Sequence, residues 1–164
     1  MLTIIGCGNP NRSDDGVGVV VAQRLRDRVA AEGLTKVRVF DAGTAGMEVM
    51  FQARGATRLI VIDACRSGSP PGSLFEVPGE ALEDQPPHSF NLHDFRWDHA
   101  LHAGRQIFKE TFPAEVTVFL IEAANLDFGL DLSPEVAATA DRVTERLTAI
   151  IAVETGTEDH VGAA

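Results

Sequence analysis

Two adjacent carboxylates stand where a glycine-containing loop meets the start of a helix. The segment IIGCGNPNRSDDGVG, residues 4–18, joins an apolar run to a helical pattern through a turn that ends in Asp14 and Asp15. A dinucleotide loop has a third glycine where this chain has Asn11, and a P-loop has a Gly-Lys pair that this segment lacks. Carboxylates at the positive end of a helix would repel a phosphate. The loop therefore has the shape of a phosphate-binding turn and the charge of a cation site.

Only one of these two aspartates is needed at the helix start. We expect Asp14 to cap the helix, and Asp15 either to complement the helix dipole or to bind a cation. Another carboxylate, Asp63, comes directly after the apolar run RLIVI, residues 58–62. In a parallel sheet with strand order 2-1-3, the strand that leads to Asp15 and the strand that leads to Asp63 are neighbours. Asp15 and Asp63 would then face one crevice. An aspartate at a strand end can also simply accept hydrogen bonds from a neighbouring turn, and that alternative stays open.

A histidine-rich segment offers a third ligand. Residues 86–104 contain His88, His93, His99 and His102. We expect a helix over residues 90–108, with His99 and His102 on one face, His93 in its first turns, and His88 at the loop–helix junction, where a side chain can turn into the crevice. Two carboxylates and one imidazole suit a divalent transition metal. No HExxH motif is present, so a zinc protease of the common type is not indicated.

Apolar runs alternate with helical patterns along the chain. This alternation predicts an α/β fold of three layers, a mainly parallel twisted sheet with helices on both faces, whose ligands bind beyond the carboxyl ends of the strands. Ser133 followed by Pro134 predicts the start of the last helix. We expect one domain over residues 1–153 and a frayed tail over residues 154–164. The expected strands are 2–7, 37–42, 58–65, 72–78 and 115–123, and the expected helices are 15–29, 44–53, 90–108 and one that begins at 134.

Composition limits the possible partners. The 164 residues carry a formal net charge of −10, which argues against nucleic acid, because binding to nucleic acid depends on neutralising phosphates with Lys and Arg. No apolar run approaches the roughly 18 residues that span a membrane, and no signal-peptide pattern is present, so we expect a cytoplasmic protein that binds no membrane. Cys7 and Cys65 form no CxxC pair, and we expect two reduced thiols, buried as small apolar groups.

Several segments together resemble the nickel–iron hydrogenase maturation endopeptidases. GCGNPNRSDDGVG is similar to the first motif of that family, DAGTAGM (residues 41–47) to its second loop, and LIVIDAC (59–65) to its strand that ends in a metal-binding aspartate. HSFNL (88–92) is similar to the segment that its metal-binding histidine opens, and LDLSPEV (130–136) to a segment before the last helix. The resemblance covers residues 2 to 150.

This resemblance implies a function and a site. Members of the family cut a C-terminal extension from the hydrogenase large-subunit precursor after nickel has been inserted. The implied metal-contacting and catalytic residues are Asp15, Asp63 and His88, with His93 or His99 as the alternative to His88. The implied substrate-binding loop is Gly43, Thr44, Ala45 and Gly46.

Nickel is the implied metal, and we expect the substrate to carry it. Three protein ligands without a thiolate would bind nickel weakly on their own. Nickel already held by cysteines of the precursor would bring the missing ligands with it. An alternative function uses the same three residues in a non-catalytic nickel-binding maturation chaperone. The second glycine loop favours the protease, because a metal carrier would not need a peptide-binding turn beside its metal.

Overall fold

The computed structural model describes residues 1–82 and 96–156. Within these residues five strands form one sheet in the order β2-β1-β3-β5-β4, parallel except for β4, which pairs antiparallel with β5 at one edge. The expected mainly parallel sheet is confirmed, and so is the adjacency of the two strands that lead to Asp15 and Asp63. The strands are β1 (Leu2–Cys7), β2 (Val37–Gly43), β3 (Arg58–Cys65), β4 (Leu74–Pro78) and β5 (Glu115–Glu122).

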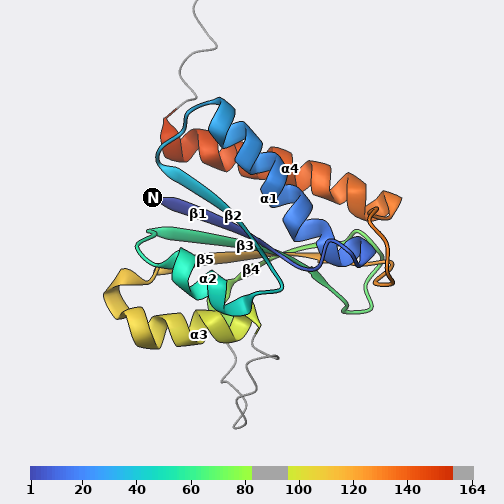
Figure 1. Cartoon of the computed structure of the whole chain (residues 1–164), viewed down its shortest axis with the longest axis horizontal. Coiled ribbons are helices and arrows are strands. Elements are labelled where there is room, and N and C mark those ends of the chain that lie inside the picture. Colours follow the sequence, from blue (N-terminus) through green and yellow to red (C-terminus); the bar gives the residue numbers. More distant parts are fainter. Residues whose placement is uncertain (83–95, 157–164) are drawn as a thin grey trace, which may run out of the picture.

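Helices cover both faces of the sheet, as expected for three layers (Figure 1). On one face lie α1 (Val17–Ala31) and α4 (Pro134–Thr155); on the other lie α2 (Gly46–Ala53) and α3 (Trp97–Phe108). Side chains alternate between the two faces along each strand, so β1 sends Ile4 toward α1 and α4 and Ile5 toward α2 and α3. In the described part of the chain, no helix has the length and apolar composition needed to cross a lipid bilayer.

Two helix boundaries differ from those that the sequence predicted. The helix expected to begin at residue 90 begins at Trp97, because Arg96 has an extended backbone (φ −91°, ψ 169°) and acts as its N-cap. The last helix runs on to Thr155, so the predicted tail is wrong at its start. Gly156, in the left-handed conformation at φ 71°, ends that helix, as is common for glycine after a helix C-terminus.

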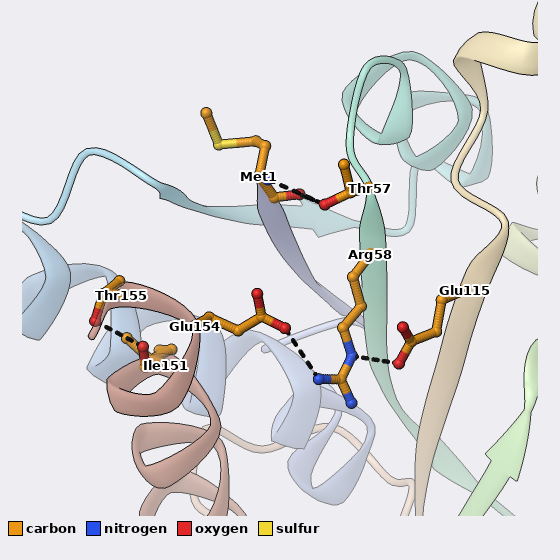
Figure 2. Close-up of polar contacts among 7 residues, drawn as sticks. All are labelled: Met1, Thr57, Arg58, Glu115, Ile151, Glu154 and Thr155. Atoms are coloured by element: carbon orange, nitrogen blue, oxygen red, sulfur yellow. Dashed lines mark hydrogen bonds and ion pairs between the residues drawn. The ribbon is translucent and has the colours of Figure 1, made fainter. Parts of the chain in front are cut away.

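The amino-terminal end of the sheet is tied together by polar contacts (Figure 2). Arg58 at the start of β3 pairs with Glu115 of β5 at 2.8 Å and with Glu154 of α4 at 3.2 Å. The amino group of Met1 donates to Oγ1 of Thr57 at 3.0 Å. These contacts hold three elements together at the end of the sheet opposite to the two candidate aspartates.

A backbone contact sets the distance between α1 and the sheet. A Cβ atom added to Gly6 of β1 would lie 2.1 Å from the carbonyl oxygen of Gly18, and one added to Gly18 would lie 2.2 Å from the carbonyl oxygen of Ile62. The first turn of α1 therefore rests directly on the carboxyl ends of β1 and β3. Since Asp15 lies three residues before Gly18, this contact also fixes how far Asp15 stands from Asp63.

Candidate active site

A pocket of about 450 Å³ opens at the carboxyl ends of the parallel strands. Asp15 and Asp63 both line it, as the strand order predicts. The predicted substrate loop contributes Gly43, Thr44 and Gly46, whereas Ala45 is not among the lining residues. The structure thus brings two of the predicted ligands and most of the predicted loop to one place.

Asp63 is held by two hydrogen bonds at the wall of the pocket. Its Oδ1 accepts from the backbone N–H of Ala64 at 2.8 Å, and its Oδ2 accepts from the indole N–H of Trp97 at 2.7 Å. Burial, with a smaller contribution from the charge of Asp15, raises the pKa of Asp63 to about 6, although both hydrogen bonds act to lower it. A carboxylate that titrates near neutrality and lies beside a second carboxylate is suited to proton transfer or to meeting a cation.

Asp15 lies in a 3-10 turn, Ser13–Gly16, that precedes α1. Its Oδ2 accepts from the backbone N–H of Asn9 at 3.0 Å, a bond that closes the first loop on itself. The side chain is half-buried and faces the pocket rather than the helix N-terminus. Its position therefore fits the hypothesis that Asp15 binds a cation better than a role as a helix cap.

Asp14 has a structural role, and the expectation that it caps α1 is wrong. Gly16 is the N-cap of that helix and no side chain bonds there. Asp14 is fully buried and accepts from the backbone N–H groups of Ala124, Asn125 and Ser133 at 2.8, 2.8 and 2.7 Å, and also from the Ser133 hydroxyl. Burial acts to raise the pKa of Asp14, but these hydrogen bonds hold it below its usual value. Asp14 thus fastens the first loop to the connection between β5 and α4.

Of the four histidine candidates, only His99 and His102 lie in the part of the chain that the structure describes. His88 and His93 lie outside the described residues, so both stay predictions. His99 accepts from the backbone N–H of Arg96 at 3.4 Å, at the start of α3, and does not line the pocket. Within residues 1–82 and 96–156, no three His, Cys, Asp or Glu side chains are grouped so that they could hold a metal. Of the three predicted ligands, the structure therefore describes two, Asp15 and Asp63, and both lie at the pocket.

Three residues at the pocket were not predicted from the sequence. Trp97, the first residue of α3, orients Asp63 through its indole N–H. It is the only tryptophan of the chain, and the need of a buried indole for an acceptor was the signal that could have found it. Arg66 and Arg96 also line the pocket, and the charge of Arg96 acts to lower the pKa of Asp63.

A buried glutamate supports the loop that follows Asp63. Glu122, at the end of β5, is 2% exposed and accepts from the backbone N–H groups of Ser67 and Gly68 at 2.9 and 3.0 Å. The Ser67 hydroxyl donates to it at 2.7 Å and the Cys65 thiol at 3.3 Å. The hydrogen bonds from Ser67 are the main reason why the pKa of Glu122 falls to about 2. The carboxylate therefore fixes the loop on which Arg66 reaches the pocket.

The thiols near the pocket are poor nucleophiles. Burial raises the pKa of Cys7 well above its usual value, and the charge of Asp63 adds to the effect. Burial and the neighbouring Glu122 raise the pKa of Cys65 to about 12. Since the thiolate is the reactive form of cysteine, neither thiol is set up for attack at neutral pH.

Glu122 should give the protein a recognisable loss of stability in acid. Its folded-state pKa of about 2 lies below the value of about 4.3 for an unfolded glutamate, so its stabilising effect is complete above the unfolded pKa and disappears as the pH falls toward 2. We expect Glu122→Gln to lower the free energy of unfolding at pH 7 and to have progressively less effect between about pH 4.3 and pH 2. Urea unfolding across this range measures it. The exposed change Glu110→Gln should keep the wild-type pH profile, and an unaltered profile in Glu122→Gln would contradict the assignment.

Solved structures of other proteins share this fold. The hydrogenase maturating endopeptidase HybD from Escherichia coli superposes with a TM-score of 0.71 at 24% identity, over 92% of this chain and 91% of that one. The NiFe hydrogenase maturation protease HybD from Thermococcus kodakarensis gives a TM-score of 0.71 at 24% identity, over 92% and 98% of the two chains. At these identities the superpositions show a shared fold, a small α/β domain.

Sequence comparison then shows the family. The family model of the HycI hydrogenase maturation proteases matches residues 19–150. The hydrogenase 2 maturation protease of Escherichia coli K12 is 29% identical over 163 residues, which span 96% of this chain and 93% of that protein. The chain belongs to the hydrogenase maturation protease family.

Proposed function

We propose that this protein is the endopeptidase that removes the C-terminal extension of a nickel–iron hydrogenase large-subunit precursor after nickel insertion. The observation that carries the proposal is the pair of carboxylates, Asp15 and Asp63, in one pocket of a chain that belongs to the hydrogenase maturation proteases. The cytoplasm is the proposed compartment, and the two free thiols of the described chain fit its reducing conditions.

Nickel enters this proposal as part of the substrate. Asp63 at the end of β3 and Asp15 in the turn before α1 offer oxygen ligands to a divalent cation. Burial and, to a smaller extent, the charge of Asp15 raise the pKa of Asp63, and a cation between the two carboxylates would relieve their repulsion. His88 is the proposed third ligand. Such a set leaves the coordination shell incomplete, and thiolates of the precursor would complete it. The enzyme would then recognise a precursor only when its nickel is in place.

The residues around the carboxylates prepare them for that contact. The Trp97 indole and the Asn9 N–H each hold one carboxylate oxygen in place, so neither side chain has to be ordered when the substrate arrives. Gly43 also lines the pocket, and its φ of 51° is a conformation that favours glycine. Without a side chain at this turn, its backbone is accessible from the pocket. We propose that the scissile segment lies along this turn. Positioning of this kind can lower a reaction barrier by about 7–11 kcal/mol.

The nickel state of the precursor tests the mechanism. With purified enzyme we expect mass spectrometry to show release of the C-terminal extension from the nickel-loaded precursor and none from the nickel-free precursor over the same time. A third reaction uses enzyme that has been incubated with Ni²⁺, desalted and given nickel-free precursor, and it too should yield no product. Equal cleavage of both precursors would contradict nickel recognition. Tight binding of the nickel-loaded precursor without cleavage would favour the chaperone instead.

A further inference from the structure

The connection between β5 and α4 displays two large apolar side chains in water. Phe128 is 88% exposed and Leu130 is 77% exposed, the highest fractions among the exposed large hydrophobic residues of the described chain. Neither side chain adds to the buried core, so their presence does not stabilise the fold through burial. We call these two residues the Phe128–Leu130 ridge. Their position on a loop that also lines the pocket makes them a candidate contact surface for another protein.

The backbone that carries the ridge is held in place by the first loop. The N–H of Ser13 donates to the carbonyl of Gly129 at 2.8 Å, and the N–H of Gly129 donates to the carbonyl of Asn11 at 3.0 Å. The Arg12 side chain donates to the carbonyl of Leu126 at 3.0 Å, and its guanidinium lies 5.7 Å from the centre of the Phe128 ring. The exposed side chains therefore sit on an ordered loop, and a partner would not have to order that backbone on binding.

The ridge begins at the pocket. Leu126 lines the pocket and Phe128 follows two residues later, while Gly8 lines it from the first loop. The two loops leave the pocket side by side, with Arg12 and Gly129 paired as in a parallel sheet. Figure 1 shows the β5–α4 connection beside the start of α1, at the end of the sheet where β1 and β3 finish. The ridge therefore continues directly from one wall of the pocket.

We propose that the Phe128–Leu130 ridge is the docking surface for the folded body of the hydrogenase large-subunit precursor while its C-terminal segment occupies the Asp15–Asp63 pocket. This inference rests on the proposed function. Continuity with the pocket identifies the occupant, because the same loop supplies a pocket wall and the ridge. The formal net charge of −10 argues against an anionic lipid surface as the partner. Phe128 with the Arg12 guanidinium beside it presents an aromatic residue and an arginine, two residue types that are enriched at protein–protein interfaces.

Polar substitution of the ridge tests the proposal. The double variant Phe128→Ser/Leu130→Ser should lower kcat/KM for the nickel-loaded precursor about 30-fold, mainly through KM, since a docking contact is made equally in the ground and transition states. The matched control is Ile107→Ser/Val153→Ser, which removes apolar side chains that are 61% and 65% exposed near the ends of α3 and α4. These helix ends lie at the opposite end of the sheet (Figure 1), and the control should keep the wild-type kcat/KM.

The outcomes separate the docking inference from the proposed function. Cleavage by the wild type together with unchanged kcat/KM in the ridge variant would overturn the docking inference and leave the protease standing. An equal loss in the control variant would also overturn it, because the effect would then not belong to the ridge. Failure of the wild type to cleave any precursor would overturn both. Thermal melting of each variant shows that it is folded, which exposed positions should allow.

Discussion

Asp63→Asn is expected to lower cleavage of the nickel-loaded precursor by roughly 10²–10⁴-fold, the range typical of losing a group that handles charge or protons in the reaction. The change removes one of the two negative charges that face the pocket and the one with a pKa near neutrality. Single-turnover rates measured by mass spectrometry give the size of the effect. Full activity of the variant would overturn the proposed mechanism.

The Asp63→Asn variant should stay folded, with a moderate loss of stability. An asparagine at this position turns an NH₂ group toward either the indole N–H of Trp97 or the N–H of Ala64, because both oxygens of Asp63 are acceptors. Such a mismatch costs about 1–3 kcal/mol, and relief from burying a charge offsets part of it. Trp97 is the only tryptophan, so its fluorescence reports directly whether the site keeps its shape. Asp27→Asn, on the exposed side of α1, is the matched control and should change neither activity nor fluorescence.

Gly18→Ala should damage stability and activity together. Alanine normally stabilises a helix relative to glycine by about 1 kcal/mol, but here the added Cβ would lie 2.2 Å from the carbonyl oxygen of Ile62 and 2.4 Å from that of Cys7. Backbone atoms cannot rotate out of the way, so α1 must move off the sheet. We expect a loss of about 3 kcal/mol in the free energy of unfolding, measured in urea. Because Asp15 moves with α1, cleavage should fall as well.

Gly33→Ala separates the two effects. Gly33 follows α1 with φ +64°, and no other atom lies near the place of its Cβ, so alanine there brings backbone strain of about 1–2 kcal/mol without a clash. This variant should lose stability and keep its cleavage rate. If Gly18→Ala were as stable and as active as the wild type, the close contact between α1 and the sheet would not set the geometry of the site.

The sequence could predict the approach of Asp15 and Asp63 because it depends on topology alone. Each aspartate follows a buried strand, the strands are parallel neighbours, and their ends must meet at one edge of the sheet. The different roles of Asp14 and Asp15 depend instead on contacts with residues more than 100 positions away. Both aspartates look equally able to cap a helix when only the local sequence is read. The tertiary structure buries one and turns the other toward the pocket.

The boundaries of α3 and α4 show a second limit. The sequence predicts a helix from residue 90, but α3 begins at Trp97, because the extended backbone of Arg96 precedes it. At the other helix the polar residues of the C-terminus hid two further helical positions, residues 154 and 155. The Arg58–Glu154 pair seen in Figure 2 holds one of them against the sheet. Capping and ion pairs decide such boundaries, and they depend on partners that a local pattern does not contain.

Asp14 also has a consequence for the order in which the protein assembles. Its hydrogen bonds join residues that are 110 to 119 positions apart, so the first loop acquires its final shape only when the β5–α4 connection has docked. Contacts of such long range form slowly, since the whole intervening chain must be brought together first. During synthesis, the first 120 residues can pair β1 with β3, but they lack the N–H donors of Ala124, Asn125 and Ser133 that hold Asp14 and its loop. A chain emerging from the ribosome should therefore gain the carboxylate pocket as one of its last folding events, after nearly the entire sheet is in place.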